Sequence, residues 1–141
     1  MGKILFTIMG VLIVANALAQ DIKTTDVPSA VKTSLGKKFP EAKGVHWEKE
    51  NGNFEANWGG KSGEDHSAQF NPSGDFVELV DNIPVSSLPA KVVSYVKDQY
   101  KTNIREAGKR TEASGKLSYE VEIKGKDLIF GLDGTFIRES H

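Results

Sequence analysis

The sequence contains no cysteine at all. Disulfide bonds, zinc–thiolate sites, iron–sulfur clusters and thiolate nucleophiles are therefore excluded, because each requires a cysteine sulfur. An excess of charge of one sign is missing as well, since 18 lysines and arginines are balanced by 19 aspartates and glutamates. Without a basic excess, the composition does not favour nucleic acid or an anionic membrane as a partner.

Long apolar runs are scarce, and the longest, residues 4–14, follows Lys3 and precedes an Ala-Leu-Ala at residues 17–19. A basic start, a short apolar run and an Ala-x-Ala exit are typical of a secretory signal peptide. The run is too short to span a bilayer comfortably. We therefore expect residues 1–19 to be a signal peptide, and the mature protein to be periplasmic or secreted without further membrane contact. The remaining length is sufficient for one domain held together by packing alone.

The sequence does contain one pattern written twice. Residues 70–76 read Phe-Asn-Pro-Ser-Gly-Asp-Phe, and residues 130–136 read Phe-Gly-Leu-Asp-Gly-Thr-Phe. In each copy two phenylalanines flank a turn that contains glycine with asparagine, proline or aspartate, which is the pattern of a β-hairpin tip. The duplication predicts that the mature chain is one structural unit repeated.

Each predicted hairpin tip is preceded by one predicted helix and by segments of alternating polarity. Apolar residues recur every fourth position over residues 27–38 and 88–100, which predicts two amphipathic helices with Asp26 and Ser87 as candidate N-caps. Alternation over segments such as 45–48, 54–58 and 117–123 predicts about four short strands in each half. The predicted organisation is a loose tail at 20–25, repeat 1 at 26–80, a linker at 81–86 and repeat 2 at 87–139.

The predicted fold is α+β: two tandem helix-plus-antiparallel-sheet repeats forming one continuous antiparallel sheet, with both helices on one face. A single repeat would leave the edges of its sheet bare, and joining the two sheets removes one such edge from each. One face of the joined sheet is then covered by helices and the other is open to water. That open face is the largest surface that the predicted fold offers to a partner.

These motifs, in this order, resemble those of the PepSY-like, β-lactamase-inhibitor-like proteins. The residues that carry the resemblance are Val27-Pro28, Phe39-Pro40, Val45-x-Trp47, Phe54-x-Ala56, the hairpin tip at 70–76 and Leu88-Pro89. The resemblance implies an exported, non-enzymatic α+β domain. It also implies a role in restraining a peptidase or binding an enzyme on a concave sheet face. The chain departs from the inhibitor proteins in lacking cysteines, and Glu106 stands where Trp47 would align in the second half.

The residue types of a hydrolase occur together in Glu64-Asp65-His66-Ser67. Neighbouring residues of a strand point to opposite faces, so Asp65 could not orient His66 as a catalytic base. His46 and His66 could ligate a metal only if cross-strand pairing brought them together. We therefore predict no catalytic residue, no metal site and no cofactor, and we do not expect an enzyme.

Polar side chains alternate with the apolar ones along the predicted strands. If the two sheets join, these side chains tile an open face of mixed charge, which is either a recognition surface or simply a solvated one. They are His46, Glu48, Glu55, Asn57, Asp65, Ser67, Gln69, Arg105, Lys109, Ser118, Glu120, Glu122 and Lys124. Trp47 is expected in the core, whereas Trp58, beside two glycines, is either core or an anchor for a partner. The predicted partner-binding residues are Trp58, His46, Glu48, Glu55, Asn57, Glu120 and Glu122.

The sequence therefore predicts an exported, non-enzymatic binding module that docks a protein partner through the open face of its sheet. The partner would be an envelope peptidase or another enzyme that the module inhibits or regulates. The alternative is a periplasmic carrier of a small molecule or a metal, and a hydrolase centred on His66 is a third hypothesis.

Overall fold

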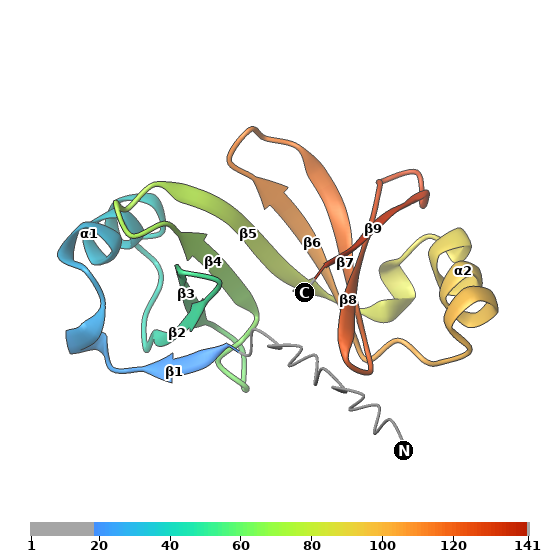
Figure 1. Ribbon diagram of the computed structural model, residues 1–141, viewed down its shortest axis with the longest axis horizontal. Helices are drawn as coiled ribbons and strands as arrows, with labels where there is room; N and C mark the ends of the chain where they lie inside the picture. The colour runs from blue at the N-terminus through green and yellow to red at the C-terminus, as the bar shows by residue number, and fades with distance from the viewer. Residues whose placement is uncertain (1–18, 141) are drawn as a thin grey trace, which may run out of the picture.

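The computed structural model describes residues 19–140. The predicted signal peptide therefore lies, apart from Ala19, outside the described residues, within which no helix is long and apolar enough to cross a membrane. Within these described residues, two α-helices, two short 3-10 helices and nine strands follow one another (Figure 1). They are β1 (Gln20–Ile22), η1 (Thr24–Asp26), α1 (Ser29–Lys38), β2 (His46–Glu50), β3 (Asn53–Trp58), β4 (His66–Phe70), β5 (Phe76–Ile83), η2 (Val85–Ser87), α2 (Ala90–Tyr100), β6 (Glu106–Glu112), β7 (Leu117–Ile123), β8 (Lys126–Phe130) and β9 (Phe136–Ser140).

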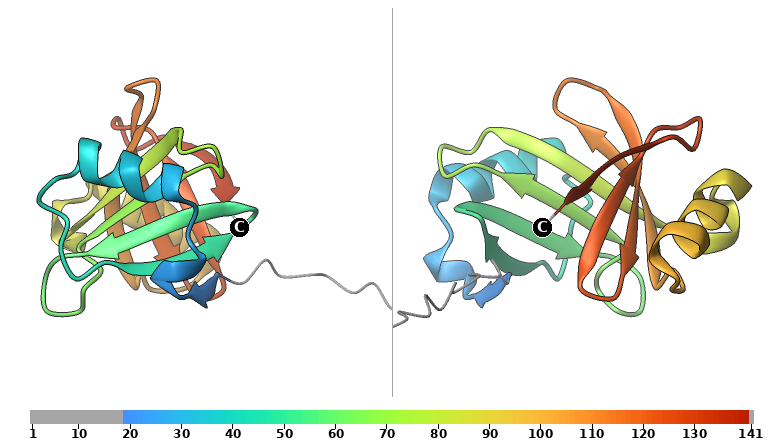
Figure 2. Two further views of the ribbon diagram at one scale, coloured as in Figure 1. Left: turned by 90° about the vertical axis from the view of Figure 1, so that its left-hand side faces the viewer. Right: turned by 45° about the vertical axis from the view of Figure 1, so that its right-hand side comes forward.

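The nine strands form one antiparallel sheet in which each strand pairs with its neighbour in sequence. The two halves of the chain meet where β5 pairs with β6, from Glu78 opposite Glu112 to Ile83 opposite Ala107. The sheet is strongly curled, and α1 and α2 lie outside the curl at opposite ends of the molecule (Figures 1 and 2). The predicted fold class, an α+β protein with one continuous sheet and both helices on one face, is confirmed.

Each helix covers a separate hydrophobic core on the convex face of the sheet. Val31 and Leu35 of α1 belong to the first core, and Val92 and Val96 of α2 belong to the second. The sheet contributes alternate residues to each core, which is why the strands read as alternating in the sequence. The largest of these side chains with no exposed surface are Phe70 in the first core and Phe130 in the second.

The two duplicated hairpin tips lie against the first turn of the helix in their own half. Gly74 and Gly134 occupy equivalent positions with φ angles of +88° and +82°. A Cβ atom at Gly74 would lie 2.7 Å from the backbone oxygen of Ala30, and one at Gly134 would lie 3.2 Å from Cβ of Lys91. Glycine is therefore required at both tips by backbone conformation and, most strongly at Gly74, by space.

Replacing Gly74 with alanine should destabilise the protein more than the same change at Gly115. Both residues have a φ angle near +88°, but a Cβ at Gly115 would meet nothing within 4 Å. The shared backbone strain corresponds to about 1 kcal/mol, and the clash with α1 raises the expected loss for Gly74→Ala to roughly 3 kcal/mol. Urea unfolding of the two variants measures the difference. Equal losses would show that the tip does not depend on its contact with the helix.

The segment predicted as a loose tail, residues 20–25, is ordered. Residues Gln20–Ile22 form β1, which pairs with β2, and Ile22 packs against the first core. The backbone hydrogen bonds of so short a strand come from its pairing with β2. The polar residues 20–25 carry no local pattern of a strand, so the sequence did not predict β1.

The segment predicted as a linker, residues 81–86, is largely secondary structure. β5 continues to Ile83, whose side chain packs against the second core, and Val85–Ser87 form η2. The predicted N-caps also differ, because Asp26 and Ser87 end the 3-10 helices. Pro28 and Pro89 occupy the N-cap positions of α1 and α2 without a side-chain hydrogen bond.

Candidate functional site

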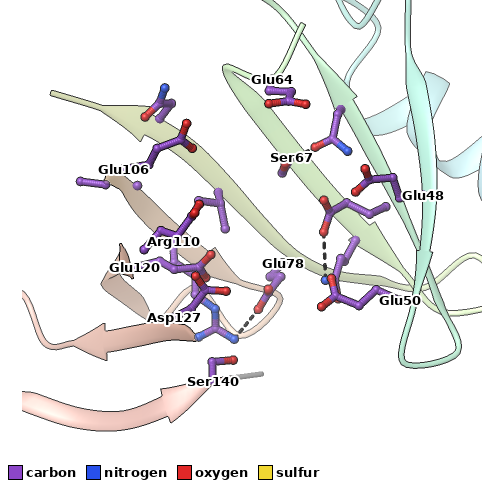
Figure 3. Close-up of a pocket in the computed structure, with 18 of the residues that line it drawn as sticks. Glu48, Glu50, Glu64, Ser67, Glu78, Glu106, Arg110, Glu120, Asp127 and Ser140 are labelled. Carbon is purple, nitrogen blue, oxygen red and sulfur yellow. Dashed lines mark hydrogen bonds and ion pairs between the residues drawn. The ribbon is translucent and has the colours of Figure 1, made fainter. Parts of the chain in front are cut away.

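The concave face of the sheet, opposite the helices, forms a polar hollow of about 400 Å³ that we call the acidic trough. Its walls come from both halves of the chain, with β2–β4 on one side, β6–β8 on the other, and β5 between them (Figure 3). Nine of the lining residues are carboxylates, and Arg110 is the one basic residue among those described. The carboxylates are Glu48, Glu50, Glu55, Glu64, Glu78, Glu106, Glu120, Glu122 and Asp127.

The register of the strands places several of these carboxylates directly opposite one another. Glu48 pairs with Glu55 across β2 and β3. Glu122 of β7 lies between Glu106 of β6 and Asp127 of β8. Like charges at directly opposed positions destabilise a sheet. The trough therefore concentrates negative charge in an arrangement that opposes folding.

Arg110 lies at the junction of the two halves and is the centre of the trough's ion pairs. Its guanidinium pairs with the Glu78 carboxylate from β5 and, at 3.5 Å, with the Glu112 carboxylate on its own strand. Only 10% of the Arg110 side chain and 15% of the Glu78 side chain are exposed. Since Glu78 and Glu112 are also opposite each other across β5 and β6, the guanidinium separates two like charges.

Glu120 projects from β7 next to this ion pair. The pKa of Glu120 is raised to about 8, mainly by burial and also by the negative charges of Asp127 and Glu78, while Arg110 opposes the increase. Burial likewise raises the pKa of Glu48, Glu50 and Glu122, each with neighbouring carboxylates adding to the effect. A carboxyl group with a pKa near 8 is mostly protonated at neutral pH.

The wall formed by β3 and β4 carries uncharged polar groups beside the carboxylates. Ser67 donates its hydroxyl proton to the side-chain oxygen of Asn57, which is itself buried. The amide of Gln69 donates to the carboxylate of Glu55 over 3.1 Å. These cross-strand bonds hold the side chains of this wall in fixed positions, with Glu55 facing the trough.

Five of the predicted partner-binding residues line the trough: Glu48, Glu55, Asn57, Glu120 and Glu122. His46 lies at the outer edge of the sheet instead, where it is exposed and its Nε2 is 2.9 Å from a carboxylate oxygen of Asp21.

Trp58 does not lie on the open face. It is 5% exposed and belongs to the first core, where its ring is 5.3 Å from the rings of Phe39 and His66. The alternation of β3 places Phe54, Ala56 and Trp58 together on the convex side, so Trp58 is unavailable as an anchor in the trough.

The sequence did not identify six charged residues of the trough: Glu50, Glu64, Glu78, Glu106, Arg110 and Asp127. Along β6 the predicted phase was wrong by one residue, because Lys109 is opposite Asp81 and Tyr119 on the other face while Arg110 faces the trough. A slip of one residue exchanges the two faces of a strand. Of the other predicted open-face residues, Asp65 and Lys124 lie in loops.

The histidines do not form the catalytic or metal-binding arrangements considered for them. His46 is opposite Asn57, and His66 is opposite Trp58, so the two imidazoles stand on opposite faces of the sheet. His66 Nδ1 is 2.7 Å from Asp81, whereas Ser67 bonds to Asn57. The group of metal-ligating side chains found among the described residues is Asp21, His46 and Glu48, at the exposed sheet edge.

Both halves of the chain match a known protein family. Residues 3–59 and 60–138 match the family described as "Putative beta-lactamase-inhibitor-like, PepSY-like". The chain belongs to this PepSY-like family. The resemblance inferred from the sequence motifs is thereby confirmed, and the chain matches no curated protein.

Several solved structures share the fold of this PepSY-like protein at low sequence identity. A protein from Bacteroides eggerthii described as a "putative periplasmic" protein has 17% identity and a TM-score of 0.61, with 81% of this chain and 88% of that chain covered. A DUF2874 family protein from Bacteroides uniformis has 19% identity and a TM-score of 0.61, with 80% and 88% covered. A BLIP-like protein from Bacteroides fragilis has 19% identity and a TM-score of 0.54, with 80% and 85% covered.

Proposed function

We propose that this PepSY-like protein is an exported, non-catalytic binding module that docks a protein partner in its acidic trough and thereby inhibits or regulates an envelope enzyme. The observation that carries the proposal is the curled sheet itself. Both helices cover the convex face, and the concave face is left open with polar side chains from both halves of the chain. A concave sheet face of this kind can receive a protruding segment of another protein.

Two observations support export and a role in the envelope. Residues 1–19 have the pattern of a secretory signal peptide. The structurally similar protein from Bacteroides eggerthii is described as periplasmic.

Membership of a family described as β-lactamase-inhibitor-like supports a binding role rather than catalysis. Consistent with this, Ser67 and His66 bond to different partners on opposite faces of the sheet.

A carrier of small molecules is less well supported by the same geometry. Sites for small organic ligands are mostly apolar concavities with a few polar groups, whereas the trough is lined mainly by carboxylates. The possible metal ligands Asp21 and His46 have 77% and 48% of their side chains exposed at the sheet edge. A protein partner therefore fits the concave face better than a small molecule does.

Site-specific photocross-linking tests the docking face. A photoreactive amino acid would replace Asn82, an exposed residue of the trough, and, as a matched control, Thr33, an exposed residue of α1 on the convex side. On irradiation in the envelope fraction of the producing cells, we expect a discrete adduct from position 82 and none from position 33. Adducts only from position 33, or the same adducts from both, would contradict docking in the trough.

A further inference from the structure

We propose that the acidic trough receives an extended segment of the partner that carries at least two arginine or lysine side chains, one for each wall. This inference rests on the proposed function, because it specifies the chemistry of the segment that docks there. It is drawn from the distribution of charge, from the register of the strands and from one ion pair already present in the trough.

The charge of the trough is out of proportion to that of the chain. The whole sequence is nearly neutral, with a formal net charge of −1, yet the trough lining has a single arginine and eight carboxylates besides the mostly protonated Glu120. The basic residues must therefore lie mostly elsewhere on the molecule. A concave surface lined by charge of one sign attracts and orients a partner of the opposite sign.

The acidic residues form two groups that face each other across the trough. One wall carries Glu48, Glu50 and Glu55 on β2 and β3, and the opposite wall carries Glu106, Glu122 and Asp127 on β6–β8. Figure 3 shows Glu48 and Glu50 across the trough from Glu106 and Asp127. Each wall contains at least one pair of directly opposed like charges. Such pairs weaken the empty protein, and a bound cation would remove the repulsion.

The trough already shows how it accommodates a guanidinium group. Arg110 lies between Glu78 and Glu112 with 10% of its side chain exposed, so two carboxylates from opposed positions hold one nearly buried cation. Glu106 and Glu122 form the same opposed arrangement across β6 and β7, with the exposed guanidinium of Arg105 4.0 Å from Glu122. A guanidinium from another chain can take the corresponding place between these two carboxylates.

A buried polar group on this side of the sheet lacks a partner. Ser118 is 1% exposed, stands opposite Arg110 on the same face of β7 as Glu120 and Glu122, and its hydroxyl has no hydrogen-bond partner within the described part of the chain. Buried hydroxyl groups are normally hydrogen-bonded. Ser118 itself does not line the trough, so a shift of Arg110, which stands opposite it, would satisfy this hydroxyl oxygen when a second cation enters.

The spacing of the carboxylates favours an extended segment over a metal ion. A calcium ion needs six to eight oxygens converging at about 2.3–2.6 Å. Among the described residues, the group of carboxylates and histidines close enough to share an ion lies at Asp21, His46 and Glu48, and Glu48 is its one trough residue. Alternate side chains of an extended peptide point to the same side and are about 7 Å apart. A segment that crosses the trough with basic residues at alternate positions therefore presents them to the two walls in turn.

The test measures binding of a fluorescent peptide with alternating arginine and serine by anisotropy, with a glutamine-for-arginine peptide as its counterpart. The double variant E106Q/E122Q removes two carboxylates of the trough. The control variant E41Q/D98N removes two exposed acidic groups outside the trough, one on the loop after α1 and one on α2. Its formal net charge is therefore the same as that of E106Q/E122Q. We expect the arginine peptide alone to bind, with affinity at least tenfold weaker for E106Q/E122Q and changed less than twofold for E41Q/D98N.

The other outcomes separate this inference from the proposed function. Failure of the arginine peptide to bind, or an equal loss in both double variants, would overturn the inference. Stoichiometric binding of calcium alone that is lost in E106Q/E122Q would overturn it too and assign the trough to a metal. If position 82 still cross-links to a partner whose contacting segment lacks basic residues, docking in the trough stands and the cationic segment does not. A melting temperature for E106Q/E122Q at or above that of the parent protein shows that weaker binding does not result from unfolding.

Discussion

Replacing Glu120 with glutamine is expected to stabilise the protein at pH 8 and to remove much of the decrease in stability between pH 5 and pH 8. The pKa of Glu120 is raised to about 8 in the folded protein, mainly by burial. Charged groups face it from each neighbouring element: Asp127 on β8, Glu78 on β5, Arg110 on β6 and Glu55 on β3. Glutamine has nearly the shape of a protonated glutamate and does not ionise.

The direction of the effect follows from where the proton is bound. Below pH 4.5 the Glu120 carboxyl is protonated in both the folded and the unfolded protein, so its contribution to stability is fully present. As the pH rises above 4.5, the unfolded chain loses this proton while the folded protein keeps it, so the contribution to stability falls. The decrease continues until the pH has passed the folded-state pKa of about 8. Because a tenfold difference in proton affinity between the two states corresponds to about 1.4 kcal/mol, the loss is on the order of 3 to 5 kcal/mol at pH 8.

Urea unfolding of the parent protein and Glu120→Gln at half-unit steps from pH 5 to pH 8.5 measures this effect. The two stabilities should nearly coincide at pH 5 and diverge steadily above it. Some slope should persist in the variant, because the pKa of Glu48, Glu50 and Glu122 is also raised. Glu41→Gln, which changes an exposed residue outside the trough, should leave the parent curve unchanged. Parallel curves for the parent and Glu120→Gln would show that Glu120 is not buried in its neutral form.

Replacing Arg110 with methionine is expected to destabilise the protein by about 3 to 5 kcal/mol. The guanidinium pairs with Glu78 and Glu112, which are opposite each other across β5 and β6. Removing the cation leaves these two carboxylates facing each other across the junction between the two halves of the sheet. Both have restricted access to water there. Breaking a buried ion pair from one side is costly because the remaining charge stays uncompensated.

Arg105→Met provides a matched control for the loss of an arginine. Arg105 has 56% of its side chain exposed and lies 4.0 Å from Glu122, so its removal should change stability by less than about 1 kcal/mol. Neutralising the opposed carboxylates in the triple variant R110M/E78Q/E112Q should recover a large part of the loss. Thermal and urea unfolding at pH 7 measure all three variants. Similar losses for Arg110→Met and Arg105→Met would mean that the pair with Glu78 does not support the junction.

The sequence predicted the features that depend on local pattern. The helical stripe at Val31 and Leu35, the alternation at Leu117–Ile123 and the duplicated hairpin tips are all local, and together they led to the correct fold class. Family resemblance rested on the same motifs and was confirmed. These features could be predicted because the periodicity of a helix or a strand is visible in consecutive residues.

The features that sequence reasoning missed depend on pairing between strands. β6 reads Glu-Ala-Gly-Lys-Arg-Thr-Glu, in which polar residues occupy both phases, so the choice between Lys109 and Arg110 could be made only from the partner strands. Asp127 was not predicted on the open face, because it directly follows the predicted turn Lys124-Gly125-Lys126. The mixed-charge face expected from the sequence is in fact acidic, because Lys109 lies on the other face, Lys124 lies in a turn, and carboxylates such as Glu78 and Asp127 line the trough instead.

The order of the strands has a consequence for how the chain reaches this structure. Since every strand pairs with the one that precedes or follows it in sequence, most contacts within the sheet form between segments that are close along the chain. Relative contact order is therefore low for a molecule dominated by β-structure, and little loop-closure entropy must be lost before each new ladder forms. The two long closures are those across the helical segments, which bring β2 to the three-residue β1 and β6 to β5. The second of them unites the two halves through the longer ladder, so we expect that union to be a slow step of folding.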